Sequence, residues 1–221
     1  MNRTRIAIAA LVIGALVAGL ACFRKEPDTH RQARQLVVYY TLSRTDQPIV
    51  IVGDSIAEAS TLPRTLCGHP IVNAGLNGAS TSSDLGAWLI AAFDGRRAAA
   101  ILVALGTNDA LKGRSRETFE ADDTALLSGL AKVTDHLAVL GIPSIEARGN
   151  VTAELQTRTM AQIDAFNALL PALAVKSGAT FVALPPMPTP HTIDGVHLDA
   201  AGYAVWDAAV LKGVSGACSK P

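Results

Sequence analysis

The side chains best suited to chemistry lie in two short segments that are far apart in this chain. Ser55 ends the first segment, after Gly53 and Asp54, and the second contains Asp194 and His197. A serine hydroxyl becomes a useful nucleophile when a histidine accepts its proton, and histidine can do so near neutral pH because its ordinary pKa is about 6.5. A carboxylate beside the histidine orients the ring and stabilises its charged form. These residue types therefore predict acyl transfer, with Ser55 as nucleophile, His197 as base and Asp194 as orienting acid.

Acyl transfer also needs hydrogen-bond donors aimed at the oxyanion of the tetrahedral intermediate. The candidates are the backbone N–H groups of Ser55 and Gly78 and the side-chain amide of Asn108. Each residue has an ordinary explanation when taken alone, because serine is a common helix N-cap and Asn77-Gly78 is a common turn pair. Their combination with an acid and a base favours a catalytic site.

The surrounding segments predict a parallel sheet. Ile49 to Val52 is an apolar, mostly β-branched run of the kind that is buried on both faces of such a sheet, and Gly53 permits a turn before Ser55. Short apolar runs alternate with longer amphipathic stretches after it, and Pro171 is expected to kink or break one of these stretches. The expected strands are 49–52, 71–72, 98–105, 143–147 and 180–184, and the expected helices are 56–59, 84–93, 119–140, 152–176 and 200–211.

This alternation predicts an α/β fold with a five-stranded parallel sheet and helices on both faces. Right-handed crossovers place the carboxyl ends of all parallel strands on one edge of the sheet. Ser55, Gly78 and Asn108 each follow an expected strand, and Asp194 and His197 follow the loop after the last one. We therefore expect these five residues to meet at that edge.

The composition argues against several other classes of function. Lys and Arg together number 19, as do Asp and Glu, so the formal net charge is zero and neither a nucleic acid nor an acidic partner is indicated. Cys22, Cys67 and Cys218 lack the close spacing of a zinc site. We expect no metal and no other cofactor.

The N-terminus carries a segment suited to a membrane or to secretion. Residues 6–23 contain no charged side chain and follow Arg3 and Arg5. Their length lies at the lower bound for a membrane span and slightly above the apolar part of a signal peptide. Three interpretations stay open: an uncleaved anchor that associates the protein with a membrane, a cleaved signal, or a lipoprotein signal with Cys22 as the first mature residue. More basic residues follow the segment than precede it, which opposes export under the positive-inside rule.

Residues 24–47 are a polar connector, and their apolar patch, 36–40, predicts a helix packed on the domain expected over 48–218. Cys67 and Cys218 lie near the margins of that domain. A disulfide and two free thiols are equally compatible with the sequence, since a bridge needs Cα atoms within about 7 Å. A bridge would support an extracytoplasmic location, periplasmic or secreted, and together with the N-terminal segment it favours export.

Four segments resemble, in order, the sequence blocks of one enzyme family. They are Gly53-Asp54-Ser55, Asn73-Ala74-Gly75-Leu76-Asn77-Gly78, Gly106-Thr107-Asn108-Asp109 and Asp194-Gly195-Val196-His197-Leu198. The chain thereby resembles the GDSL or SGNH hydrolases, which include esterases, lipases, lysophospholipases, thioesterases and carbohydrate acetylesterases. The resemblance covers about residues 48–211. Ala57 stands where the nucleophile elbow of α/β-hydrolases has its second glycine, which argues against that fold.

The resemblance implies a flavodoxin-like, three-layer α/β/α sandwich. It assigns Ser55, Asp194 and His197 to a catalytic triad, and Ser55, Gly78 and Asn108 to the oxyanion hole. The implied partner is a small-molecule ester. We expect short-acyl or O-acetyl esters, because no long apolar insertion is present to cover a fatty chain. The alternatives are a lysophospholipase or thioesterase acting on lipid substrates, and a non-catalytic binding module on the same fold.

Overall fold

The computed structural model describes residues 29–218. From Arg34 onward these residues form one compact unit, which carries the sheet and the site. The predictions for residues 1–23, including Cys22, lie outside the described residues and stay predictions, as do the boundaries of the connector and the domain. Within residues 29–218, no helix is long and apolar enough to cross a membrane.

A six-stranded sheet in the order β2-β3-β1-β4-β5-β6 forms the centre of the unit. The strands are β1 (Ile49–Gly53), β2 (Thr65–Leu66), β3 (His69–Gly75), β4 (Ala100–Ala104), β5 (Leu137–Leu140) and β6 (Thr180–Val182). Every pairing is parallel except that of β2, which lies antiparallel to β3. The predicted α/β class and parallel sheet are confirmed. The strand β2 adds a sixth strand to the expected five, and its two residues are too short to show a periodic pattern.

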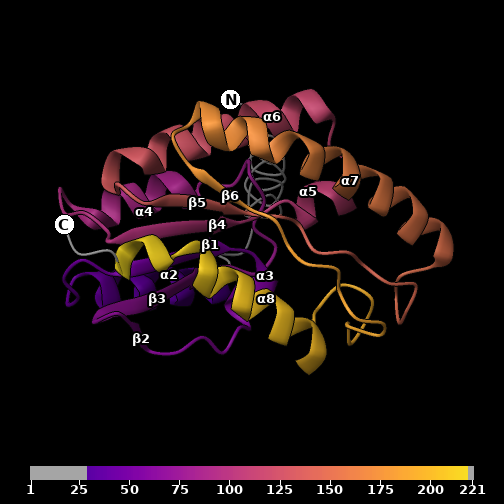
Figure 1. Cartoon of the computed structure of the whole chain (residues 1–221), viewed down its shortest axis with the longest axis horizontal. Coiled ribbons are helices and arrows are strands. Elements are labelled where there is room, and N and C mark those ends of the chain that lie inside the picture. The colour runs from indigo at the N-terminus through magenta and orange to yellow at the C-terminus, as the bar shows by residue number, and fades with distance from the viewer. Residues whose placement is uncertain (1–28, 219–221) are drawn as a thin grey trace, which may run out of the picture. The chain divides into compact units, whose positions relative to one another are not determined.

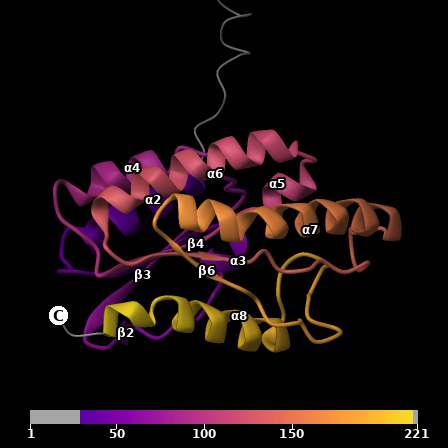
Figure 2. The same cartoon turned by 45° about the horizontal axis from the view of Figure 1, so that its top comes forward.

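Helices cover both faces of this sheet (Figures 1 and 2). The helices are α2 (Thr29–Leu42), α3 (Ser55–Glu58), α4 (Leu85–Phe93), α5 (Thr107–Leu111), α6 (Arg116–Leu130), α7 (Ala153–Lys176) and α8 (Ala200–Gly213), with 3-10 turns η1 (Ala131–Val133) and η2 (Ser215–Cys218). Val50 and Val52 of β1 pack in one core with α4, α6 and α7, while Ile49 and Ile51 pack in the other core with α3 and α8. All four side chains are fully buried, which explains the unbroken apolar run of this strand.

The chain between 119 and 147 differs from the prediction. The expected helix 119–140 ends at Leu130, and the fourth parallel strand is β5, Leu137–Leu140, rather than 143–147. All four residues of β5 are buried, and Gly141 follows the strand rather than a helix. Leucines at 137 and 140 fit a helical period as well as a short strand buried on both faces, and periodicity alone does not separate the two.

The other long helices begin where the sequence indicates. Thr152 caps α7 by accepting a hydrogen bond from the Leu155 N–H, and Asp199 caps α8. Of the kink or break predicted at Pro171, the break does not occur, because α7 continues to Lys176. Buried side chains lie on both sides of this proline, so packing against the sheet holds the helix together where one backbone hydrogen bond is lost.

The predicted contact between the connector and the domain is present in α2. Val38 and Leu42 are buried in the core that also holds α4, and the Arg34 guanidinium donates to the Gly75 carbonyl oxygen at 3.0 Å. Near the C-terminus, Cys218 forms a disulfide with Cys67, and the Cα atoms of the two residues are 5.2 Å apart. Of the two arrangements compatible with the sequence, the structure therefore contains the bridge.

Two glycines allow α3 to cross closely over the carboxyl ends of β1 and β3. A Cβ atom on Gly53 would lie 2.4 Å from the Ala57 Cβ, and one on Gly75 would lie 2.2 Å from the Glu58 backbone nitrogen. Gly53 does not adopt a positive φ, so close packing rather than turn freedom requires glycine there. This packing fixes the position of Ser55, the first residue of α3.

Candidate active site

The structure brings Ser55, His197 and Asp194 into one chain of hydrogen bonds. The His197 Nε2 atom lies 3.0 Å from the Ser55 Oγ atom, and the His197 Nδ1 atom lies 2.7 Å from Asp194 Oδ2. With Nδ1 protonated, the ring donates to the carboxylate and Nε2 accepts from the hydroxyl. The two predicted segments therefore meet although 142 positions separate Ser55 from His197.

Asp194 holds the histidine through its backbone as well as through the ring. Its Oδ1 atom accepts hydrogen bonds from the Val196 N–H at 3.0 Å and the His197 N–H at 2.9 Å. Burial by itself would raise the pKa of Asp194, but the hydrogen bonds from His197 and Val196 outweigh it and lower that pKa to about 2. Asp194 is therefore a carboxylate at neutral pH, as an acid that orients a histidine base requires.

Asp54, not Ser55, caps the short helix α3. The buried Asp54 side chain accepts a hydrogen bond from the Ile56 N–H at 2.9 Å, and burial raises its pKa to about 6. The helix N-cap explanation considered for Ser55 is therefore wrong. Ser55 occupies the first helical position, where the backbone N–H has no partner inside the helix and can meet a negatively charged oxygen.

Two further side chains hold the other end of α3 in place. The Asn73 side-chain amide donates to the Ala57 carbonyl oxygen at 2.7 Å, and the Tyr203 hydroxyl donates to the Ile56 carbonyl oxygen at 2.8 Å. Burial, together with the charges of Asp207 and Asp54, raises the pKa of Tyr203 to about 12, so its hydroxyl remains a donor. Neither residue is predictable as a support of Ser55, since Asn73 lies within β3 and Tyr203 lies on α8.

The predicted donors Gly78 and Asn108 follow the two strands that flank β1, and of the two only Asn108 lines the cavity that contains Ser55. Gly78 follows β3, and Asn108 lies at the start of α5, just after β4. The Asn108 Nδ2 atom donates to the Ala79 carbonyl oxygen at 2.9 Å, and Asn108 lines the same cavity as Ser55. One N–H of the amide is thus used for orientation, and the second stays available to a ligand.

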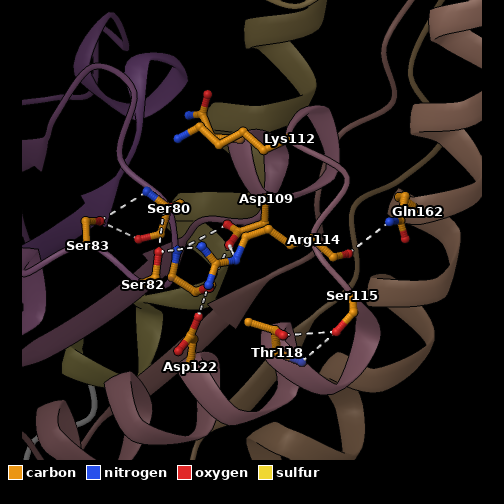
Figure 3. A network of polar contacts seen from close by, with 12 residues as sticks. Ser80, Ser82, Ser83, Asp109, Lys112, Arg114, Ser115, Thr118, Asp122 and Gln162 are labelled. Carbon is orange, nitrogen blue, oxygen red and sulfur yellow. Dashed lines mark hydrogen bonds and ion pairs between the residues drawn. The ribbon is translucent and has the colours of Figure 1, made fainter.

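A buried carboxylate ties these two loops together. Asp109 accepts hydrogen bonds from the backbone N–H of Thr81 at 3.1 Å and from its hydroxyl at 2.8 Å. The Arg114 guanidinium lies against Asp109 and also reaches Asp122 and Ser82, as Figure 3 shows. This network holds the segment after Gly78 against the segment that carries Asn108, so it sets the separation of the two donors.

A second buried acid, Asp123, lies on α6 close enough to Asp109 for their charges to interact. Burial, and then the charge of Asp109, raise the pKa of Asp123 to about 7. Well below about pH 4 this carboxyl group is protonated in both the folded and unfolded states. As the pH rises toward 7, the unfolded state loses the proton more readily, so the free energy of unfolding falls.

We therefore expect Asp123→Asn to stabilise the protein at high pH and to leave its stability almost unchanged at low pH. The expected gain near pH 8 is about 1–3 kcal/mol in the free energy of unfolding, measured by urea titration. Asp122→Asn is the control, because it removes a partly exposed carboxylate that pairs with Arg114 and should bring no gain. An equal gain at both pH values would show that ionisation of Asp123 is not the cause.

The candidate site opens into a small cavity of about 180 Å³. Its lining combines the reactive side chains with polar amides and a few aliphatic groups: Asp54, Ser55, Asn77, Thr107, Asn108, Leu111, Asn150, Val151, Asp194, Val196 and His197. Asn150, Val151 and Leu111 are additional to the residues expected from the sequence. Among residues 29–218, no cluster of three His, Cys, Asp or Glu side chains is arranged to hold a metal ion.

A hydroxyl, an imidazole and a carboxylate in one chain of hydrogen bonds beside one cavity are the arrangement that activates a serine for acyl transfer. Residues 51–205 match the model of the GDSL-like Lipase/Acylhydrolase family. The chain belongs to this family and has its esterase and acylhydrolase fold. No curated protein matches the chain significantly.

Several solved structures share the fold of this chain. A putative platelet activating factor protein from Streptococcus pneumonia is 23% identical with a TM-score of 0.67, and the alignment covers 93% of this chain and 99% of that one. A GDSL-like lipase from Bacteroides thetaiotaomicron is 16% identical with a TM-score of 0.62, covering 82% and 97% of the two chains. An acetylxylan esterase from Geobacillus stearothermophilus is 16% identical with a TM-score of 0.59, covering 77% and 94%.

Proposed function

We propose that this protein is a serine esterase that cleaves carboxylic esters through an acyl-enzyme intermediate. The observation that carries the proposal is the continuous contact from the Ser55 hydroxyl through the His197 ring to the Asp194 carboxylate. Ser55 follows β1 by two residues and lines the same cavity as Asn108, which is consistent with a nucleophile near an oxyanion hole.

The reaction proceeds in two halves. His197 Nε2 takes the hydroxyl proton while Ser55 Oγ bonds to the ester carbonyl carbon, and the carbonyl oxygen becomes an oxyanion that accepts from the Ser55 and Gly78 N–H groups and the Asn108 amide. The C–O bond to the alcohol then breaks, and the imidazolium gives its proton to the leaving oxygen. Water, deprotonated by His197, attacks the acyl-enzyme in the same way, and the carboxylic acid and free Ser55 are released.

Covalent labelling tests this proposal against a non-catalytic binding module on the same fold. A fluorophosphonate phosphonylates a serine, with loss of fluoride, only when a base activates its hydroxyl, so the probe should modify Ser55 and no other serine. Intact-mass and peptide mass spectrometry identify the modified residue. An unlabelled protein, with the fold intact by circular dichroism, would favour the binding module.

The size of the cavity supports a short acyl group. The cavity has a volume of about 180 Å³, and it is lined by the reactive side chains and by the aliphatic side chains of Leu111, Val151 and Val196. An acyl chain gains roughly 0.8 kcal/mol for each CH₂ that is buried, and carbons that extend beyond these three side chains gain nothing. The carboxamides of Asn77 and Asn150 line the same cavity and suit a polar alcohol part of the ester.

We therefore expect acetyl to hexanoyl esters to be the best substrates, with kcat/KM flat or falling beyond about eight acyl carbons. A p-nitrophenyl ester series from acetyl to palmitoyl, kept below micelle formation, measures this dependence. A steady rise toward long chains would replace the proposal with a lysophospholipase or a thioesterase acting on lipid substrates. The apolar segment 6–23 is the sequence feature that favours this alternative, because it could bring the protein to a membrane.

We further propose an extracytoplasmic location, periplasmic or secreted. The support is the Cys67–Cys218 disulfide, because such bridges persist mainly in oxidising compartments. Thiol titration of denatured, unreduced protein isolated from its native compartment tests the proposal, and free Cys67 and Cys218 there would contradict it.

A further inference from the structure

We propose that Glu146 is a positioning residue that fixes the loop carrying Asp194 and His197. This inference rests on the proposed function and extends it to a residue outside the four sequence blocks. Glu146 follows β5, whereas Asp194 and His197 lie in the loop between β6 and α8. Glu146 touches neither Ser55 nor the reactive cavity, so its effect would pass through the loop alone.

The Glu146 carboxylate accepts hydrogen bonds from residues 191 and 192 of this loop, shortly before Asp194. Its Oε2 atom accepts from the His191 N–H at 3.1 Å and from the Thr192 N–H at 2.9 Å, and also from the Thr192 hydroxyl. Its Oε1 atom lies 3.3 Å from the His191 Nδ1 atom. An ionised carboxylate has enough lone pairs for all of these donors, whereas a glutamine would direct its NH₂ group at one of them.

The charged form of Glu146 is the one that the loop stabilises. The side chain is only 15% exposed. Burial by itself would raise the pKa of Glu146, but the hydrogen bonds from Thr192 and His191 outweigh it and lower that pKa. Charge-assisted hydrogen bonds are shorter and stronger than neutral ones, so a single carboxylate can hold a loop that has little secondary structure.

Backbone contacts continue this junction as far as the catalytic acid. The Glu146 N–H donates to the Gly195 carbonyl oxygen at 2.8 Å, and the Arg148 guanidinium donates to the Thr192 carbonyl oxygen at 2.6 Å. A Cβ atom on Gly195 would lie 2.6 Å from the Glu146 carbonyl oxygen, and one on Gly149 would lie 2.8 Å from the Asp194 carbonyl oxygen. The two segments therefore lie backbone against backbone directly beside Asp194.

The loop transmits this position to His197 by closing on itself. The Ile193 N–H donates to the His197 carbonyl oxygen at 2.8 Å, and the Asp199 N–H donates to the His191 carbonyl oxygen at 2.9 Å. Thr192 and Leu198 thus form an antiparallel bridge, and the residues between them are a tight turn. Moving Thr192 moves the whole turn, because its two ends are bonded to each other.

We expect Glu146→Gln to lower kcat by roughly 10- to 100-fold while KM changes little, because a small displacement of a catalytic group has effects of this size. The rate of fluorophosphonate labelling at Ser55 should fall in parallel. Hydrogen–deuterium exchange should show faster exchange of the amides in residues 191–199, independently of any activity. Thr192→Val, which removes only the hydroxyl donor, should change all three quantities in the same direction but less.

Asn167→Ala is the matched control. Asn167 also pins the segment after β5, by accepting from the Ile142 N–H at 2.8 Å and donating to the Ile142 carbonyl oxygen at 3.0 Å, but it does not contact the loop 191–199. It should lower the melting temperature and leave kcat and labelling near wild type when assayed well below that temperature.

Three outcomes would overturn the inference. The first is a Glu146→Gln protein whose kcat, rate of Ser55 labelling and amide exchange all equal those of the wild type. The second is a loss of kcat in Asn167→Ala as large as that in Glu146→Gln, which would indicate general destabilisation. If Glu146→Gln does not fold, wild-type labelling and exchange in Thr192→Val would be the third. A wild-type protein that is not labelled at Ser55 would instead contradict the proposed function, while the exchange measurement would still report whether Glu146 anchors the loop.

Discussion

Replacing Ser55 by alanine is expected to abolish almost all ester hydrolysis, with a loss of kcat on the order of a million-fold. The change removes the oxygen atom that lies 3.0 Å from His197 Nε2 and would attack the ester. Folding should be unaffected, because Asp54 still caps α3 and alanine is a good helix former. Measurements of kcat/KM, of fluorophosphonate labelling and of the melting temperature separate the two effects.

Ser60→Ala is the control for this experiment. Ser60 lies just after the same helix, and its hydroxyl donates to the Ala57 carbonyl oxygen at 2.8 Å, away from the reactive cavity. It should cause at most a small loss of stability and leave turnover near the wild-type value. If Ser55→Ala kept roughly a tenth of wild-type activity, a nucleophilic role for Ser55 would be untenable, since such a role predicts a loss many orders of magnitude larger.

The arrangement of the reactive residues was accessible from the sequence because parallel sheets constrain it strongly. Once β1, β3 and β4 are expected to be parallel, the residues that follow them must share one edge of the sheet. Ser55, Gly78 and Asn108 follow these strands closely, so small errors in the strand ends do not separate them. The loop carrying Asp194 and His197 precedes a well-capped helix, which ties it to the same edge.

One strand and several supporting side chains could not be predicted from the sequence, for physical reasons. The strand β5 has the spacing of a buried helix, and its parallel pairing with β4 and β6, which no sequence period shows, makes it a strand. Supports such as Glu146, Asp109 and Tyr203 act through contacts made by side chains that lie far from the reactive residues in sequence. A single acidic residue after a strand carries no local signal of the loop that it will bind.

Asn108→Ala is expected to lower kcat by roughly 100- to 1000-fold, which corresponds to about 2.7–4 kcal/mol of lost transition-state stabilisation. The reason is electrostatic: the Ala79 carbonyl oxygen orients the Asn108 amide at 2.9 Å, so its second N–H is already in place when the oxyanion forms. KM should change far less, because a donor that acts on developing charge contributes little to ground-state binding.

The structure also indicates why this loss would report on the oxyanion hole rather than on a displaced loop. The Asn108→Ala substitution removes the hydrogen bond to the Ala79 carbonyl oxygen. The hydrogen bonds from Thr81 to the buried Asp109 remain and hold the segment after Gly78 in place. Asn77→Ala is the matched control, since it removes a carboxamide from the same cavity and should raise KM more than it lowers kcat. Steady-state kinetics with a short p-nitrophenyl ester distinguishes the two patterns. If Asn108→Ala changed KM alone, as expected for Asn77→Ala, Asn108 would be a substrate contact, and the oxyanion would have to be stabilised by the Ser55 and Gly78 backbone donors without it.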